Sequence, residues 1–314
     1  MTASIVQAFA GSERIQNDYL YLLLDPMAEC APEDPLSIAS LTQALGEQAI
    51  TRVLRPDLAH TAEACPALVQ LAAPGELPAK ALLESSERYA YEDAGYKKRY
   101  VCGWLSSECP PETLAEHLAA RCLDVAPAAT QSVSPWFEPL RLELLAASVG
   151  NTFPDLLWPI RRWLCPTSWG GYTLFRGAPT GAGMDIPALA RQTQRLAPLI
   201  GDFLDAWRLA LRFPLTYAPR HWRGDTLLPP QAAAHAFRLV RDAHKRGLRL
   251  SADVIDLCMH RVFIHPDLPL HPHVQADIAR ALAGTSTLQA RFETYDDSAW
   301  MRIVASLPAA VSYS

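Results

Sequence analysis

The densest group of side chains able to do chemistry lies in the carboxy-terminal third of the chain. Cys258, His260, His265, His271 and His273 supply a thiolate and imidazoles, which are the usual zinc ligands. Such a cluster would suit a metal-dependent hydrolase. Its spacing matches no standard zinc signature, however, and three of the histidines stand beside prolines in a stretch that reads as a surface loop. We therefore expect solvated loop histidines and no metal, and keep the hydrolase as an alternative.

Two other patterns fall short of a catalytic motif. Ser106 and Ser107 follow a predicted strand and precede a predicted helix, where a hydrolase would carry its nucleophile, but the flanking glycines of a tight turn are missing. The glycine-rich stretch 177–183 lacks the Lys-Ser/Thr of a phosphate-binding loop and the glycine order of a dinucleotide fold. We expect capping serines and a flexible linker here. Neither stretch is therefore predicted to supply a reaction.

The chain has eight tryptophans, and only four of its 28 basic residues are lysines. Aromatic residues and arginines dominate the hot spots of protein interfaces, and arginine suits bidentate contacts. The competing interpretation is that tryptophans at helical spacing are core residues. An arginine bias also more often reflects a GC-rich genome than recognition, so a protein interface is kept here as one of the interpretations.

Composition and charge exclude several classes of protein. Half of the residues are hydrophobic and 19% are charged, which is ordinary for a folded globular chain. The net charge of −5 leaves no basic footprint for nucleic acid. Seven scattered cysteines without a Cys-x-x-Cys pair indicate reduced thiols, and the apolar stretch 19–24 is too short for a signal core or a membrane span. We expect a cytoplasmic protein that binds neither nucleic acid nor membrane.

The order of predicted elements places these residues in two lobes. Short apolar strands alternate with helices in the first part of the chain, which predicts an α/β amino-terminal lobe with a mixed sheet and flanking helices over residues 1–176. Residues 177–186 form the predicted linker. A mainly α-helical carboxy-terminal lobe follows over residues 187–314. The predicted strands are 19–24, 50–54, 67–71, 100–105, 132–137 and 172–175, and the predicted helices include 76–89, 139–148, 153–164, 187–213, 230–246, 251–264, 274–282 and 298–307.

Four short motifs occur in a recognisable order along this framework. A strand ends in Leu24-Asp25-Pro26, a proline-led apolar run covers 65–71, a strand end reads Gly103-Trp104-Leu-Ser-Ser, and Trp136-Phe-Glu-Pro-Leu-Arg141 opens a helix. In this layout the chain resembles the bacterial domain-of-unknown-function 4123 family. Members of that family are adaptor chaperones that load toxic effectors onto the spike of the type VI secretion system.

The resemblance covers about residues 19–307 and implies a function without catalysis. It implies an α/β lobe that grips an effector, a helical second lobe, action in the cytoplasm and no cofactor; Glu138 stands where the family has an aspartate. The implied partners are a toxic effector protein and a spike protein. A toxin-binding immunity protein is a further alternative. The candidate partner-binding residues are Asp25, Trp104, Trp136, Phe137, Glu138, Arg141 and Trp163.

Overall fold

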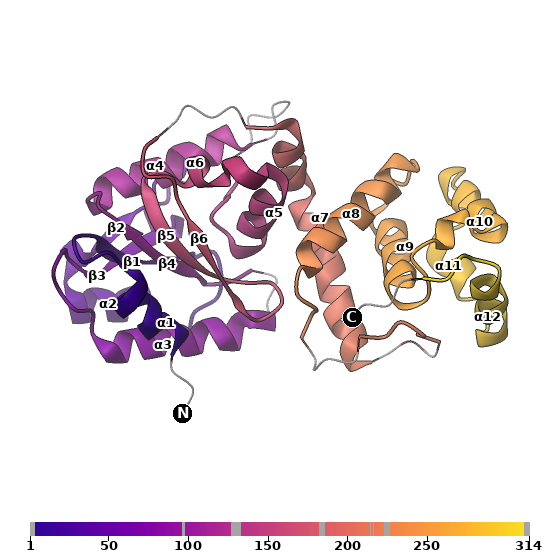
Figure 1. Ribbon diagram of the computed structural model, residues 1–314, viewed down its shortest axis with the longest axis horizontal. Coiled ribbons are helices and arrows are strands. Elements are labelled where there is room, and N and C mark those ends of the chain that lie inside the picture. Colours follow the sequence, from indigo (N-terminus) through magenta and orange to yellow (C-terminus); the bar gives the residue numbers. More distant parts are fainter. Residues whose placement is uncertain are drawn as a thin grey trace. The chain divides into compact units, whose positions relative to one another are not determined.

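The computed structural model (Figure 1) describes residues 4–95, 98–126, 133–181, 186–213, 215, 217–222 and 227–310. The chain divides into two compact units, Met1–Arg195 and Leu196–Ser314. This division falls inside α7 (Ala188–Arg212), downstream of the predicted linker at 177–186, of which residues 182–185 lie outside the described part. The first unit contains a sheet with helices and the second is helical. The predicted order, an α/β lobe followed by a helical lobe, is confirmed.

The sheet of the first unit has six strands in the order β2-β3-β1-β4-β5-β6. Every pairing between these strands is antiparallel, so the predicted mixed sheet is wrong in this detail. The reason lies in burial: five of the six residues of β1 are buried, and a strand covered on both faces reads as a continuous apolar run, as parallel strands do. The strands are β1 (Tyr19–Leu24), β2 (Ile50–Arg52), β3 (Ala67–Ala72), β4 (Val101–Ser107), β5 (Ile160–Pro166) and β6 (Tyr172–Arg176).

Helices cover both faces of this sheet (Figure 1). Successive side chains of a strand point to opposite faces, so β1 feeds two cores. Tyr21 and Leu23 join one core with residues of α4–α6, whereas Leu22 and its neighbours on the other face join a second core with residues of α1–α3. The covering helices are α1 (Ile5–Ala8), α2 (Ile38–Leu45), α3 (Lys80–Glu92), α4 (Pro111–Asp124), α5 (Pro139–Val149) and α6 (Phe153–Leu157).

Two predictions around the fourth motif are wrong. The described part of the predicted strand 132–137 forms no strand, and the predicted helix 153–164 is a short helix, α6, followed by the strand β5. Pro159 lacks the N–H that would continue the helix. Beyond it, β5 pairs with β4 on one side and β6 on the other, and these pairings satisfy its backbone groups. The helix predicted at 139–148 is confirmed as α5.

The second unit consists of the remainder of α7 and five further helices: α8 (Ala232–Lys245), α9 (Ser251–Phe263), α10 (Pro272–Leu282), α11 (Leu288–Phe292) and α12 (Asp297–Ala305). All the predicted helices of this lobe are present, and α11 is additional. Ser251 is the first helical residue of α9, and Leu250 occupies the N-cap position. Asp253 accepts a hydrogen bond from the backbone N–H of Leu288 at 2.7 Å, which ties α11 to α9. Within the described ranges, no helix combines the length and apolarity needed to span a membrane.

Candidate functional site

Asp25 is a fully buried carboxylate at the end of β1. Its backbone N–H donates to the carbonyl of Tyr100 at 2.8 Å, and its Oδ1 accepts from the backbone N–H of Met27 at 3.0 Å. The following proline, Pro26, cannot donate to a ladder, which is consistent with the strand ending here. Because β1 pairs with β4, this strand end lies beside the segment that leads into β4. That segment carries Lys98, which the sequence interpretation did not select.

Lys98 joins Asp25 to the fourth motif. Its Nζ lies 3.1 Å from Asp25 Oδ2 and 2.8 Å from Glu138 Oε1. The Lys98 side chain is 34% exposed, whereas that of Asp25 is 0% exposed. One ammonium group therefore bridges two acidic residues that are 113 positions apart in the sequence, and it keeps one side open to solvent.

Glu138 and Arg141 extend this chain of charges across the start of α5. Glu138 precedes the helix, and its Oε2 accepts from Arg141 Nε at 2.9 Å. Arg141 Nη1 also donates to the carbonyl of Gln194 at 2.8 Å and to Ser134 Oγ at 3.2 Å. Gln194 returns a hydrogen bond from Nε2 to the carbonyl of Arg141 at 3.1 Å. We call Asp25, Lys98, Glu138 and Arg141 the charge chain.

The electrostatics of the charge chain depend on Lys98. Burial raises the pKa of Asp25, and Glu138 raises it further, while the ammonium of Lys98 offsets part of this shift. Burial alone would lower the pKa of Lys98, but the charges of Glu138 and Asp25 outweigh it, so that the net pKa is raised. Lys98 is therefore firmly cationic at neutral pH and compensates a carboxylate that is poorly solvated.

A cavity of about 600 Å³ opens next to the charge chain. Lys98 lines it together with Tyr89 and Tyr100, which come from α3 and from the approach to β4. On its rim, Met27 is 50% exposed. Asp93 also lines the cavity and is held by Arg99 through a buried ion pair of 2.9 Å. The cavity thus combines two tyrosine rings, one lysine, an exposed methionine and the carboxylates of Glu29, Glu92 and Asp93.

The predicted aromatic residues lie in the cores rather than on the surface. Trp136, Phe137 and Trp163 are 0% exposed in the core beneath α4–α6, with the rings of Trp136 and Trp163 5.5 Å apart. Trp104 is equally buried in the core on the opposite face of the sheet. Each indole N–H has an internal acceptor. Trp136 donates to the carbonyl of Leu118 and Trp163 to the carbonyl of Cys102, while Trp104 donates to the hydroxyl of Ser86. These rings fix the framework around the charge chain, and only Asp25, Glu138 and Arg141 of the seven predicted residues meet within it.

Close packing explains why glycine occupies position 103 in the Gly103-Trp104 motif. Gly103 adopts φ +139°, and a Cβ at this position would lie 2.4 Å from Trp163 Nε1 and 2.6 Å from the carbonyl oxygen of Leu164. Only glycine allows β5 to approach β4 this closely while Trp163 donates to the carbonyl of Cys102.

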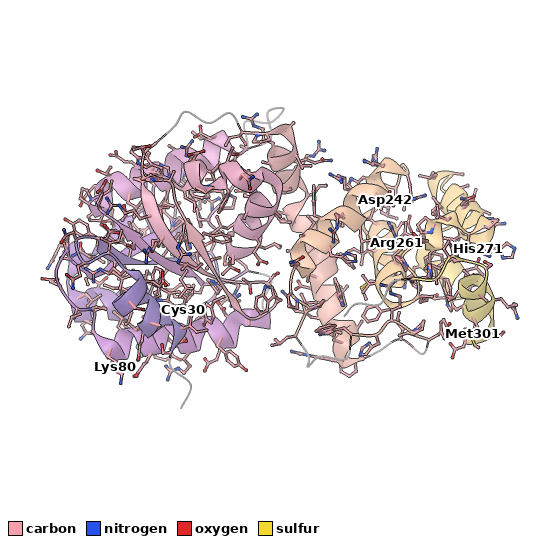
Figure 2. The ribbon with its side chains drawn as sticks, in the orientation of Figure 1. Cys30, Lys80, Asp242, Arg261, His271 and Met301 are labelled. Atoms are coloured by element: carbon pink, nitrogen blue, oxygen red, sulfur yellow. The ribbon has the colours of Figure 1, made fainter. Side chains whose placement is uncertain are left out.

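The histidine cluster of the second unit does not form one constellation. His265 accepts from the backbone N–H of Asp267 at Nδ1 and contacts the carbonyl of Pro308 through Nε2. His271 lies at the edge of the helical unit (Figure 2), and its Nδ1 accepts from the backbone N–H of His273. His260 packs between Phe292 and Trp300 instead. Across the ranges that the structure describes, no group of three or more His, Cys, Asp or Glu side chains is placed to hold a metal ion.

The two serines considered as nucleophiles are engaged elsewhere. Ser106 Oγ donates to the buried carboxylate of Asp18 at 2.6 Å, and Ser107 Oγ donates to the carbonyl of Pro159 at 2.9 Å. Arg161 completes the first group with an ion pair of 2.9 Å to Asp18. These contacts link β1, β4 and β5 and give both hydroxyls a structural role.

Comparison of the chain with family models, with curated proteins and with solved structures finds no match. The resemblance described above therefore depends on the sequence motifs and their order alone. Lys98 is the residue that the sequence interpretation missed, and one signal marked it. It is one of only four lysines in an arginine-rich chain, and it stands three residues before a buried strand.

Proposed function

We propose that this protein is a non-catalytic adaptor chaperone that binds a toxic effector in the cytoplasm and delivers it to a type VI secretion spike protein. The proposal starts from the four motifs and from the order of an α/β unit followed by a helical unit, which is the order that the resemblance implies. It is consistent with the engaged hydroxyls of Ser106 and Ser107.

One observation carries most weight. Asp25 and the segment 136–141 are matched to the family by separate motifs, and the fold brings them together through Lys98. Lys98 compensates both carboxylates by its charge, and this ion pair is what holds Asp25 Oδ2, which has no hydrogen-bond partner among the described residues. A shared framework built on this network would explain why motifs so far apart in the sequence occur together.

The cavity beside Lys98 is the place where an effector segment would reach this network. Its rim offers the exposed side chain of Met27, and its walls include Tyr89 and Tyr100. An apolar and aromatic centre with polar groups around it is the usual anatomy of a protein interface. We infer that the effector places an apolar segment here, with a polar group directed at Lys98.

Co-expression tests this function directly. The proposal predicts that a toxin-like protein is encoded beside this gene. When the tagged chain is produced together with that protein, we expect the two to co-purify as one species on size exclusion. Met27→Glu, which adds a charge on the rim, should reduce the recovered effector at least about tenfold, since burying an unpaired charge costs several kcal/mol.

A matched control separates binding from charge. Leu77 is 90% exposed and does not line the cavity, so Leu77→Glu should leave recovery unchanged. Equal loss in both variants would contradict the proposed effector surface, and absence of any complex with the parent chain would contradict the function.

A further inference from the structure

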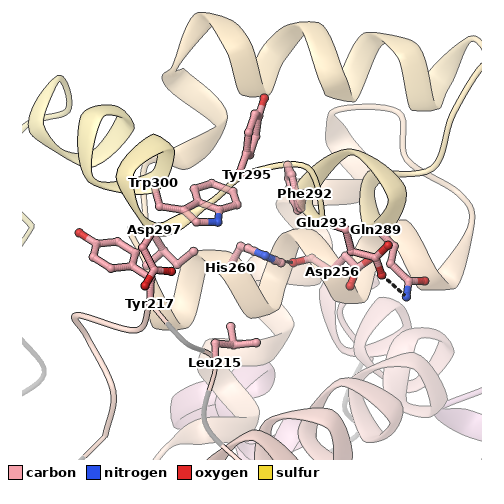
Figure 3. A pocket seen from close by; sticks show the side chains of 11 residues that line it. Leu215, Tyr217, Asp256, His260, Gln289, Phe292, Glu293, Tyr295, Asp297 and Trp300 are labelled. Carbon is pink, nitrogen blue, oxygen red and sulfur yellow. Dashed lines mark hydrogen bonds between the residues drawn. The ribbon is translucent and has the colours of Figure 1, made fainter.

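A second cavity, of about 400 Å³, lies entirely within the helical unit. This volume is in the range of ordinary ligand pockets. Three helices and the segment after α7 contribute to it (Figure 3). Its lining includes Asp256, His260, Phe292, Glu293, Asp297 and Trp300.

Aromatic rings form one part of the wall. The ring centroid of Trp300 lies 5.4 Å from that of Phe292, with an angle of 72° between the ring planes. It lies 4.9 Å from the centroid of Tyr295, with an angle of 84°. His260 packs 5.2 Å from Trp300. Burial lowers the pKa of His260, and its Nδ1 faces the backbone carbonyl of Asp256 at 2.8 Å. The imidazole is therefore neutral at pH 7, protonated on Nδ1, and adds no positive charge to the pocket.

Carboxylates form the rest of the wall. In the view of Figure 3, Asp256 and Glu293 lie together at one end of the pocket and Asp297 lies at the other, with Trp300 and His260 between them. Among the residues that the structure describes, no lysine or arginine forms an ion pair with these three carboxylates. Glu293 accepts a hydrogen bond from Gln289 Nε2 at 3.1 Å, which is a neutral partner.

The charge on Asp256 is uncompensated. Burial raises its pKa to about 6, and the neighbouring carboxylates of Asp253 and Glu293 contribute to the same shift. By contrast, the buried Asp277 on α10 is surrounded by Arg280, Arg291 and the hydroxyl of Tyr295, and its pKa is lowered. Asp256 therefore lacks the neighbouring cations that surround Asp277 in the same unit.

We propose that this pocket binds a basic side chain, arginine in preference to lysine, from a protein partner. A guanidinium stacks on an aromatic face and pairs with carboxylates, and both kinds of group line the cavity. The openness of Glu293 and Asp297 to solvent lets such a side chain enter from outside. Placing the cation on a protein partner rests on the proposed function, in which this chain must meet both an effector and a spike protein.

The test uses the full chain and a small probe. N-acetyl-arginine methylamide is titrated against the protein by ligand-observed NMR, with the citrulline analogue, which has the same shape without the charge, as its control. We expect millimolar binding of the arginine probe, binding at least tenfold weaker for citrulline, and loss of at least tenfold in Asp256→Asn and in Glu293→Gln. Glu116→Gln removes an exposed carboxylate from α4 in the other unit and should change nothing.

Three results would overturn the inference: equal binding of arginine and citrulline, no binding of either, or an equal loss in Glu116→Gln. Asp256→Asn guards against misfolding as the cause of lost binding, because this variant is expected to have a higher melting temperature than the parent chain. Failure of the probe to bind leaves the co-expression test of the adaptor function intact. Conversely, probe binding in a chain that captures no effector would support the pocket and contradict the adaptor.

Discussion

Lys98 places its ammonium 3.1 Å from the carboxylate of Asp25, which has no exposed surface of its own. Glu138 shares the same ammonium at 2.8 Å. Two carboxylates from two distant motifs therefore depend on one lysine, which lies on the approach to a central strand. This relationship links two of the sequence motifs to the fold, so substitution of Lys98 tests most easily whether the two carboxylates depend on it.

Lys98→Met should lower the free energy of unfolding by about 2 kcal/mol at pH 7, because removing this partly exposed cation leaves the buried carboxylate of Asp25 uncompensated. Chemical denaturation measures this effect. In the variant the already raised pKa of Asp25 rises further, so its folded pKa lies above its unfolded pKa. The variant should therefore recover relative to the parent as the pH falls from 7 to 5. The double variant with Asp25→Asn should regain much of the loss at pH 7; strictly additive losses would contradict the pairing.

Gly103→Ala should destabilise the first unit by about 3 kcal/mol, since the new methyl group meets Trp163 and the backbone of Leu164 at a strained φ. Gly75→Ala is the matched control. Gly75 also has a positive φ, of +80°, but nothing lies within 4 Å of a Cβ there, so only the backbone cost of about 1 kcal/mol applies. Equal losses in the two variants, measured by denaturation, would show that the approach of β5 to Gly103 is not the cause.

Asp256→Asn should stabilise the helical unit at neutral pH. The pKa of Asp256 is raised to about 6, above that of the unfolded chain, so ionising this group opposes folding as the pH rises through that value. After allowance for partial exposure, we expect a gain of about 1 kcal/mol at pH 8 and almost none at pH 4. Thermal unfolding at the two pH values measures the difference. A gain of the same size at both would mean that charge is not responsible.

His117 should make the fold less stable as the pH falls, whereas Asp256 makes it less stable as the pH rises. Burial beside the edge of Trp136 lowers its pKa to about 3, and Arg121 adds to the shift. The unfolded chain binds the proton near pH 6.5, so this residue makes the fold less stable as the pH falls below that value. In His117→Phe, the slope of unfolding free energy against pH between 6 and 4 should decrease by about 1 kcal/mol per pH unit. An unchanged slope would assign the acid sensitivity to other groups.

Elements that are decided by residues close together in the sequence could be predicted, and elements decided by strand pairing could not. Local signals sufficed for β1, for α5 with Pro139 in its first turn and for the helices of the second unit, because apolar periodicity and proline act over a few residues. Strand direction and β5 were missed, since strand pairing decides both; β6 follows β5 closely, but its other partner, β4, lies far away in the chain.

The candidate site divides in the same way. Asp25, Glu138 and Arg141 were recognisable in their motifs, yet their meeting depends on a lysine whose importance arises only when β4 lies beside β1. The tryptophans were selected as partner-binding residues because they are typical of interfaces, but the two cores of the sheet bury them completely. Residue type identified the chemistry, and the long-range pairing of strands decided which residues lie near the surface.

We propose that the chain binds an effector and a spike protein, and a pull-down from the cells that produce it measures this most directly. The tagged protein is isolated from a cell lysate, its companions are identified by mass spectrometry, and bound metal is measured on the same sample. We expect one toxin-like protein and a spike component, with recovery of the toxin reduced by Met27→Glu and unaffected by Leu77→Glu. A protein that emerges with neither companion, or carrying about one equivalent of zinc, would contradict it.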